Sequence, residues 1–269
     1  MVIFGSSVSK PLDSSINEDS IRKAPGLIAV SDGAGGGGLY AEKWSQYLVE
    51  NLPEKPILNY MDFCNWLDSI WESFFNNFEK VSREQGSFAL RKFYDEGAYA
   101  TIACLWIDEN NHKYYWLTYG DSVVFKYNIH TKDLFYSINN LSEFNNPPFL
   151  VNCIHSTKEE GFCMGQGSYN KNEIFFIASD ALSHYILAMY LISKNKSDGQ
   201  ILAALDQHSK NTLVLKNALL LRNINFEARL TKLIRSSKNR FNFMRHLYSL
   251  YNNKYLTSDD YSFVCVQGL

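Results

Sequence analysis

The sequence lacks any apolar run that approaches the ~20 residues of a membrane-spanning helix. It also lacks a charge excess, because 26 basic and 28 acidic residues leave a net charge of −2. Such a balance gives no general attraction to nucleic acid or to anionic lipid. Residues 1–10 show neither the basic start nor the apolar stretch of a secretory signal. We therefore expect no membrane partner and no nucleic-acid partner.

Cysteine is sparse and shows no pairing pattern. The five cysteines are odd in number and include no Cys-x-x-Cys pair, which is typical of free thiols in a reducing compartment. We therefore expect a cytoplasmic protein whose cysteines are mostly small core residues. These residues are Cys64, Cys104, Cys153, Cys163 and Cys265.

Several catalytic motifs are missing as well. There is no Gly-x-Ser-x-Gly and no phosphate loop ending in Gly-Lys-Ser/Thr, so a hydrolase nucleophile elbow and a P-loop site are excluded. The six histidines show no His-x-x-x-His spacing, which gives no support to a zinc site. Function must therefore be sought among other residue types.

Residues 24–38 form the most informative stretch that is present. A short apolar run, Leu27 to Val30, leads into Ser-Asp-Gly and then into a run of glycines. This pattern predicts a buried strand with Asp32 at its end, followed by backbone that can approach a metal or a phosphate closely. A glycine-rich turn between a strand and a helix would give the same pattern, and for this stretch alone it is the favoured interpretation.

Periodicity predicts an α+β fold. Short connections between apolar segments indicate antiparallel hairpins, including one with Asp121 in its turn. Two sheets packed face to face, with amphipathic helices outside, would bury both kinds of element. We expect one domain over residues 1–269, with Asn145–Gly167 as its longest irregular segment. The predicted strands are Val2–Val8, Leu27–Val30, Tyr99–Ile107, Lys113–Tyr119, Ser122–Tyr127, Glu173–Ala178 and Tyr261–Gln267, and the predicted helices are Leu39–Asn51, Met61–Gln85, Leu182–Ser193 and others through Tyr251.

Aspartates recur at the ends of these predicted strands. Carboxylates brought together from distant strand ends are the ligands that Mg²⁺ and Mn²⁺ prefer. For any single aspartate, ordinary turn chemistry is the favoured explanation, so the argument depends on the set. The set consists of Asp19, Asp32, Asp121, Asp180, Asp259 and Asp260.

The order of these aspartates resembles that in the metal-dependent protein phosphatases of type 2C, in particular a divergent bacterial branch. Each matching piece is short, but five occur in the right order between Asn17 and Val266. The family fold is a four-layer α-β-β-α sandwich, which agrees with the architecture expected from periodicity. The matching pieces are Asn17–Asp19, Ala29–Gly36, Tyr119–Ser122, Ile177–Ala181 and Ser258–Ser262.

The resemblance implies a dinuclear Mn²⁺ or Mg²⁺ centre. Asp32 would bridge both ions, and the Gly33 carbonyl would bind one of them. Asp180 and Asp259 would hold the other ion. Glu18 and Asp19 would act largely through metal-bound water, and Asp121 with Asp180 matches a third, weaker metal position.

The resemblance also implies the reaction. A metal-activated water would hydrolyse phosphoserine or phosphothreonine on a protein substrate, with Asp32, Asp180 and Asp259 as the catalytic set. The substrate would be a phosphoprotein, such as the product of a cognate Ser/Thr kinase. We expect the protein to act as a monomer.

The sequence departs from the family pattern where the phosphate is bound. Ser14 stands where the family usually has an arginine that grips the substrate phosphate, and Val123 replaces another common arginine. Lys10, Arg22 and Lys23 are candidates to replace that contact, although each is typical of a solvated surface charge. Milder departures are Ala34 and Ala181, where some members have His and Gly.

These departures leave a second function open. The chain could keep the fold as a catalytically weak or inactive module that binds a phosphoprotein or a regulatory partner. The segment Lys210–Arg245 carries nine basic residues and one acid, Glu227. It could offer a positive surface to such a partner, or it could be an ordinary solvated helical face.

Overall fold

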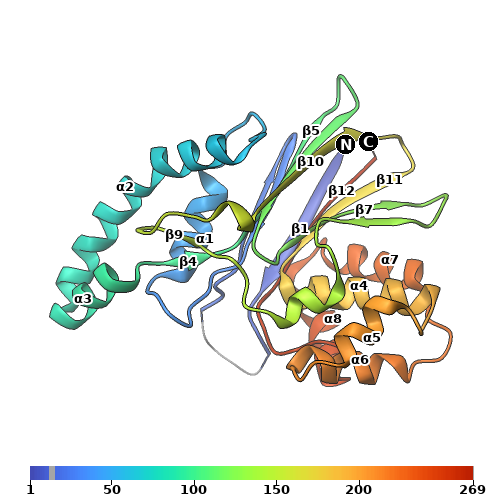
Figure 1. Ribbon diagram of the computed structural model, residues 1–269. Coiled ribbons are helices and arrows are strands. Elements are labelled where there is room, and N and C mark those ends of the chain that lie inside the picture. Colours follow the sequence, from blue (N-terminus) through green and yellow to red (C-terminus); the bar gives the residue numbers. More distant parts are fainter. Residues whose placement is uncertain (12–15, 269) are drawn as a thin grey trace.

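The computed structural model describes residues 1–11 and 16–268, and its centre consists of two five-stranded sheets (Figure 1). Neighbouring strands in both sheets are antiparallel. Sheet I has the order β1 (Val2–Val8), β12 (Tyr261–Gln267), β11 (Glu173–Ala178), β7 (Val123–Asn128), β8 (Leu134–Tyr136). Sheet II has the order β10 (Phe162–Ser168), β6 (Lys113–Tyr119), β5 (Ile102–Asp108), β3 (Leu27–Ser31), β2 (Ser20–Ala24). A separate pair joins β4 (Tyr99–Ala100) to β9 (Val151–Asn152).

The two sheets pack face to face because their strands are apolar on both sides. Along β5, Ala103 and Leu105 lie in the core between the sheets, whereas Cys104 and Trp106 lie in the core beneath helices. Successive side chains of a strand point to opposite faces, so a strand buried on both faces is an almost unbroken apolar run. Strand β12 follows the same rule, with Val264 in the inter-sheet core.

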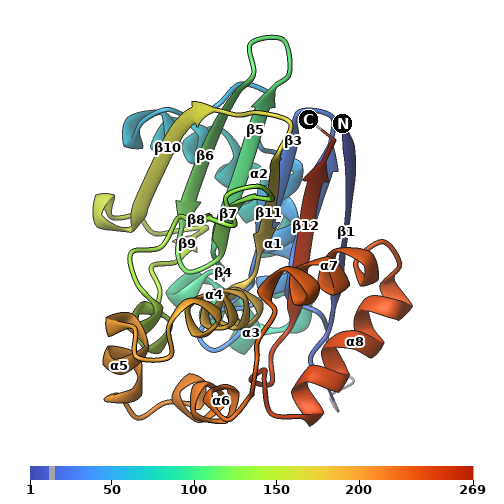
Figure 2. The same ribbon diagram turned by 90° about the vertical axis from the view of Figure 1, so that its right-hand side faces the viewer.

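Helices cover the outer face of each sheet (Figures 1 and 2). Sheet II is covered by α1 (Ala41–Glu50), α2 (Tyr60–Gln85) and α3 (Ser87–Glu96). Sheet I is covered by α4 (Asp180–Lys194), α5 (Gly199–Leu205), α6 (Lys210–Leu219), α7 (Phe226–Ser236) and α8 (Arg240–Asn252). The predicted four-layer α-β-β-α sandwich is thereby confirmed.

The bounds of helix α2 are determined by residues at its two ends. Apolar and aromatic side chains recur on one face of α2, which packs in the core against sheet II. Phe63 and Phe74 on this face are almost fully enclosed. Asn59 caps the N-terminus by accepting the Asp62 N–H at 2.8 Å. Gly86, at φ 110°, ends the helix where the sequence predicted an end. The chain then turns directly into α3, which was not predicted.

The hairpin predicted around Asp121 was wrong. Strands β6 and β7 lie in different sheets, so Gly120–Ser122 carries the chain from sheet II to sheet I. Gly120 makes this crossing at φ 107°, and a Cβ on it would lie 2.7 Å from Thr101 Cγ2. The hairpin between β5 and β6 is confirmed.

The irregular segment predicted for Asn145–Gly167 was also partly wrong. Its C-terminal part is β10, which pairs with β6 along its whole length at the edge of sheet II. Glycine is a poor strand former, but here Gly165 and Gly167 leave room for the rings of Trp116 and Tyr114. Strand β2 was missed as well, and the predicted strand Tyr99–Ile107 is interrupted at Thr101. Across the described parts of the chain, no helix combines the length and apolar character needed to cross a membrane.

Candidate active site

The strand ends opposite the chain termini bring the predicted aspartates together. In sheet II, Ser20 pairs with Ser31, so Asp19 before β2 lies beside Asp32 after β3. In sheet I, Ala178 pairs with Val123 on one side and Phe263 on the other. Asp180, the first residue of α4, therefore lies near the residues that precede β7 and β12. Those residues are Asp121, Asp259 and Asp260.

The electrostatics confirm that these side chains are neighbours. The pKa of Asp32 is raised well above its ordinary value by burial and by the negative charges of Asp19, Asp180, Asp259 and Asp121. Burial and nearby carboxylates also raise the pKa of Asp180 to about 7. The same two causes raise the pKa of Asp259 to about 7 and that of Asp121 to about 6. The structure thus brings five predicted site aspartates into one cluster, which we call the aspartate cluster.

Asp19 is the most enclosed member of the cluster. Its side chain is 5% exposed, and neither carboxylate oxygen has a hydrogen-bond partner with good geometry. Burial and Asp260 raise its pKa, while the nearby Ser262 and Ser179 hydroxyls partly oppose that shift. A buried carboxylate without hydrogen bonds is costly unless a positive charge compensates it.

Thr101 fixes the backbone of Asp32. The Thr101 N–H donates to the Asp32 carbonyl at 2.8 Å, and the Asp32 N–H donates to Thr101 Oγ1 at 3.2 Å. Thr101 Oγ1 also lies 2.9 Å from Ser122 Oγ, next to Asp121. This residue therefore connects two parts of the cluster, and no motif in the sequence signalled it. Thr101 lies in the break between β4 and β5, where its N–H binds the Asp32 carbonyl.

The glycines after Asp32 allow close backbone approach. A Cβ on Gly33 would lie 2.6 Å from the Glu18 carbonyl oxygen and 2.8 Å from that of Ala41. The Glu18 carboxylate contacts Gly35, whose N–H donates to it. Burial is the main reason that the pKa of Glu18 is raised. Glycine is thus required at position 33, where a Cβ would meet backbone, whereas at position 35 a Cβ would meet only the movable end of the Glu18 side chain.

Asp260 has a different role from its neighbour Asp259. Its Oδ1 accepts the Lys10 N–H at 2.8 Å, and its Oδ2 accepts the Glu18 N–H at 2.6 Å. One carboxylate therefore fixes the chain just after β1 and just before Asp19. The sequence pattern included Asp260 but assigned it no role.

Opposite effects on stability are expected for these two aspartates. Replacing Asp260 by alanine leaves two backbone N–H groups without their acceptor, which should cost about 2 kcal/mol. Asp259→Ala removes a carboxylate with a raised pKa and should leave the metal-free protein equally stable or more stable at pH 8. Urea unfolding in EDTA measures both, and equal losses for the two variants would refute the assignment.

The candidate phosphate-binding cations are not equivalent. Arg22 donates to the carbonyl oxygen of Leu52 at 2.8 Å just beyond the C-terminus of α1, and Lys23 donates to that of Gly5 at 3.0 Å. Lys10 is the cation whose charge lowers the pKa of Glu18 and Asp259. Ser14 lies outside the described residues, and Val123 is 1% exposed in the core beneath α4.

A cavity of about 330 Å³ adjoins the cluster at Asp121. Its walls include Asn146–Phe149 and Glu160–Gly161, which belong to the segment predicted to be irregular. That segment therefore lies beside the aspartate cluster.

The cluster fits divalent cations by donor type, burial and mutual proximity, because carboxylate oxygens are the ligands of Mg²⁺ and Mn²⁺. Within residues 1–11 and 16–268, however, no three His, Cys, Asp or Glu side chains are arranged so that they could jointly hold a metal ion. Asp32 hydrogen-bonds the Asp180 side chain, and Asp180 and Asp259 accept backbone N–H groups of the residues that follow them. The carboxylates are thus gathered but are engaged with each other and with backbone.

Solved structures share this architecture over the whole chain. The serine/threonine phosphatase PstP of Mycobacterium tuberculosis matches with a TM-score of 0.54 at 15% identity, covering 100% of this chain and 99% of that one. The chain has the type 2C phosphatase fold. The catalytic domain of PstP in complex with two manganese ions shares the type 2C fold, with a TM-score of 0.53, 14% identity and coverage of 98% and 96%. The serine/threonine phosphatase Stp1 of Staphylococcus aureus matches with a TM-score of 0.52 at 14% identity, covering 98% of this chain and 93% of that one.

The type 2C resemblance predicted from five short motifs is therefore confirmed at the level of fold. No protein-family model and no curated protein matches the sequence. The type 2C fold is thus retained in this chain at a sequence identity of about one residue in seven.

Proposed function

We propose that residues 1–269 act as a Mn²⁺- or Mg²⁺-dependent phosphatase that removes phosphate from serine or threonine in a protein substrate, such as that of a Ser/Thr kinase. The observation that carries this proposal is the aspartate cluster at the junction of the two sheets. Its carboxylates raise each other's pKa, which is unfavourable without a compensating positive charge. The match to PstP, which binds two manganese ions, supports the same proposal.

In this proposal the chain's residues have distinct tasks. Asp32 lies between the other carboxylates and would contact both ions, and the Gly33 carbonyl would bind one of them. Asp180 and Asp259 would hold the other ion. Asp19 would act largely through metal-bound water, and Asp121 with Asp180 would form a third, weaker metal position. The bound ions would neutralise phosphate charge and lower the pKa of a water molecule. The rigid turn at Thr101 would hold Asp32 in place.

The test is hydrolysis of p-nitrophenyl phosphate and of a phosphothreonine peptide with Mn²⁺, with Mg²⁺ and with EDTA. We expect turnover with either metal and none in EDTA. Equal rates in all three conditions, or none in any, would refute the proposal.

Lys10 is expected to bind the substrate phosphate in place of the family arginine. Lys10→Ala should lower kcat/KM for the phosphothreonine peptide by roughly 10-fold, because a charge-assisted hydrogen bond is lost. Lys23→Ala is the matched control, since Lys23 contacts the Gly5 carbonyl instead. A variant of Lys10 that keeps the wild-type kcat/KM would contradict the assignment.

Two observations favour a second candidate, a phosphatase-like module that binds a phosphoprotein or regulatory partner without turnover. Val123 is buried where the resemblance would place an arginine, and in the part of the chain that the structure describes no three His, Cys, Asp or Glu side chains are arranged so that they could jointly hold one metal ion. Phosphopeptide binding without hydrolysis in excess Mn²⁺ would select this candidate over the enzyme.

A further inference from the structure

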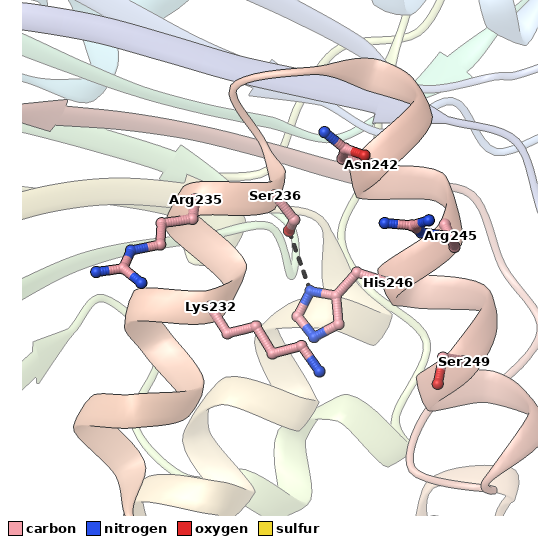
Figure 3. Close-up of a pocket in the computed structure, with 7 residues that line it drawn as sticks. All are labelled: Lys232, Arg235, Ser236, Asn242, Arg245, His246 and Ser249. Atoms are coloured by element: carbon pink, nitrogen blue, oxygen red, sulfur yellow. Dashed lines mark hydrogen bonds between the residues drawn. The ribbon is translucent and has the colours of Figure 1, made fainter.

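A basic cavity lies between α7 and α8, two of the helices that cover sheet I (Figure 3). Its volume is about 460 Å³. The lining includes three cations and no carboxylate, and no member of the aspartate cluster contributes to it. The lining residues are Lys232, Arg235, Ser236, Asn242, Arg245, His246 and Ser249.

In the part of the chain that the structure describes, the side chains of Lys232, Arg235 and Arg245 form no hydrogen bond or ion pair with another residue. In the same region Arg229 donates to the Tyr185 hydroxyl, and Arg240 donates to the Ser7 carbonyl. The single acid of the segment, Glu227, pairs with Lys132 at 2.7 Å and does not line the cavity. Figure 3 shows Lys232 and His246 extending from α7 and α8 into the space between the two helices. The local positive charge is therefore not balanced by a lining acid.

Neutral groups add hydrogen-bonding capacity. His246 Nδ1 lies 3.0 Å from Ser236 Oγ, so the other ring nitrogen remains available to a ligand (Figure 3). Burial, followed by the charges of Lys232 and Arg229, lowers the pKa of His246 to about 4. The ring is therefore neutral at pH 7. An arginine, a lysine, an amide and hydroxyls are groups that bind a phosphate monoester. Arg245 supplies the arginine, because Figure 3 shows the Arg235 guanidinium directed away from the space between the two helices.

We propose that this cavity is a second phosphate-binding site, which docks a phosphorylated segment of a partner protein. A concave site of this volume fits one phosphate with its adjoining side chain, whereas a nucleic acid requires an extended basic surface. The net charge of −2 also gives the whole molecule no attraction for nucleic acid. The site is separate from the aspartate cluster, and its occupation does not depend on catalysis.

The experiment uses the full chain in EDTA, where the aspartate cluster repels phosphate. A fluorescent phosphothreonine peptide and its unphosphorylated form are titrated by anisotropy at about 0.15 M salt. We expect preference for the phosphorylated peptide, and roughly 30-fold weaker binding to Lys232→Ala/Arg245→Ala. The matched control is Lys238→Ala/Arg240→Ala, which removes the same charge from neighbouring residues outside the cavity lining and should bind as wild type does.

Several outcomes would overturn the inference. These are equal binding of both peptides, equal loss in both double variants, and stronger binding of a single-stranded oligonucleotide than of the phosphopeptide. Hydrolysis of p-nitrophenyl phosphate by Lys232→Ala/Arg245→Ala is measured in parallel and should equal that of wild type. An inactive wild type that still shows cavity-dependent peptide binding would refute the proposed catalysis alone.

Discussion

Replacing Asp32 by alanine is expected to lower Mn²⁺-dependent hydrolysis of p-nitrophenyl phosphate by at least about 10³-fold. Loss of one preorganised hydrogen-bond donor already costs 10²- to 10³-fold in hydrolases, and a carboxylate shared by two cations should contribute more. Asp32 is the member of the cluster whose pKa is raised by four other carboxylates, so it occupies the centre of the negative charge. Its loss should affect both proposed metal positions.

The appropriate control is Asp68→Ala, which removes an exposed carboxylate of α2. That variant should keep the wild-type rate. Circular dichroism and the Tm in EDTA establish whether Asp32→Ala is folded, and we expect it to be at least as stable as wild type because a repelled charge is gone. A folded Asp32→Ala variant within about 10-fold of the wild-type rate would contradict the proposed site.

Saturating Mn²⁺ is expected to raise the Tm by about 5–10 °C at pH 8. A ligand at 100 times its Kd adds about 2.7 kcal/mol, and each kcal/mol shifts the Tm of a domain of this size by roughly 2–4 °C. The effect should depend strongly on pH, because the carboxylates that would bind the ions have raised pKa values.

The sign of the pH dependence follows from those shifts. A carboxyl whose pKa is higher in the folded chain stabilises the fold at low pH, and that contribution is lost as pH rises through the folded value. The pKa is raised from 3.8 to about 6 for Asp121 and to about 7 for Asp180 and Asp259, so the Tm in EDTA should fall as the pH rises to about 7 and should level off above it. Buried His184, with its pKa lowered to about 4, acts in the opposite direction, but mainly below pH 6.5. Mn²⁺ should remove most of the decline.

Asp32→Asn provides the control for this measurement. It should have a higher Tm than wild type at pH 8 in EDTA and a smaller shift with Mn²⁺. A wild-type Tm that Mn²⁺ leaves unchanged at pH 8 would argue against a metal at the aspartate cluster.

The sequence was most informative where local patterns and chemistry agree. Val2–Val8, Lys113–Tyr119, Glu173–Ala178 and Tyr261–Gln267 were predicted with the bounds that the structure shows, because each segment is rich in β-branched or aromatic residues. The ends of these strands then placed the aspartates. Their gathering could be predicted because antiparallel neighbours bring strand ends to a common edge.

Other features depend on tertiary contacts that no local pattern encodes. Strand β10 contains glycines that pack under Trp116 and Tyr114, and β2 carries two cations, so neither resembles a strand by composition. The crossing at Gly120 could not be distinguished from a hairpin, because a short turn suits either connection. Contacts also separate Arg22, which binds the end of α1, from Lys10, which acts on the cluster.

Because the chain crosses between the sheets at Gly120, mutations in the core between the sheets should affect the aspartate cluster. Asp19 and Asp32 lie at the ends of strands of sheet II, whereas Asp180 and Asp259 lie just beyond the ends of strands of sheet I, so the cluster spans both sheets. One buried hydrogen bond, between the Thr101 and Ser122 hydroxyls, links the two sheets at this point. The distances between the carboxylates therefore depend on how the two sheets are aligned. A substitution that changes the side-chain volume at Leu105 or Val264, which lie between the sheets, would therefore shift the carboxylates relative to one another. Such a variant should lose activity while the chain is still folded.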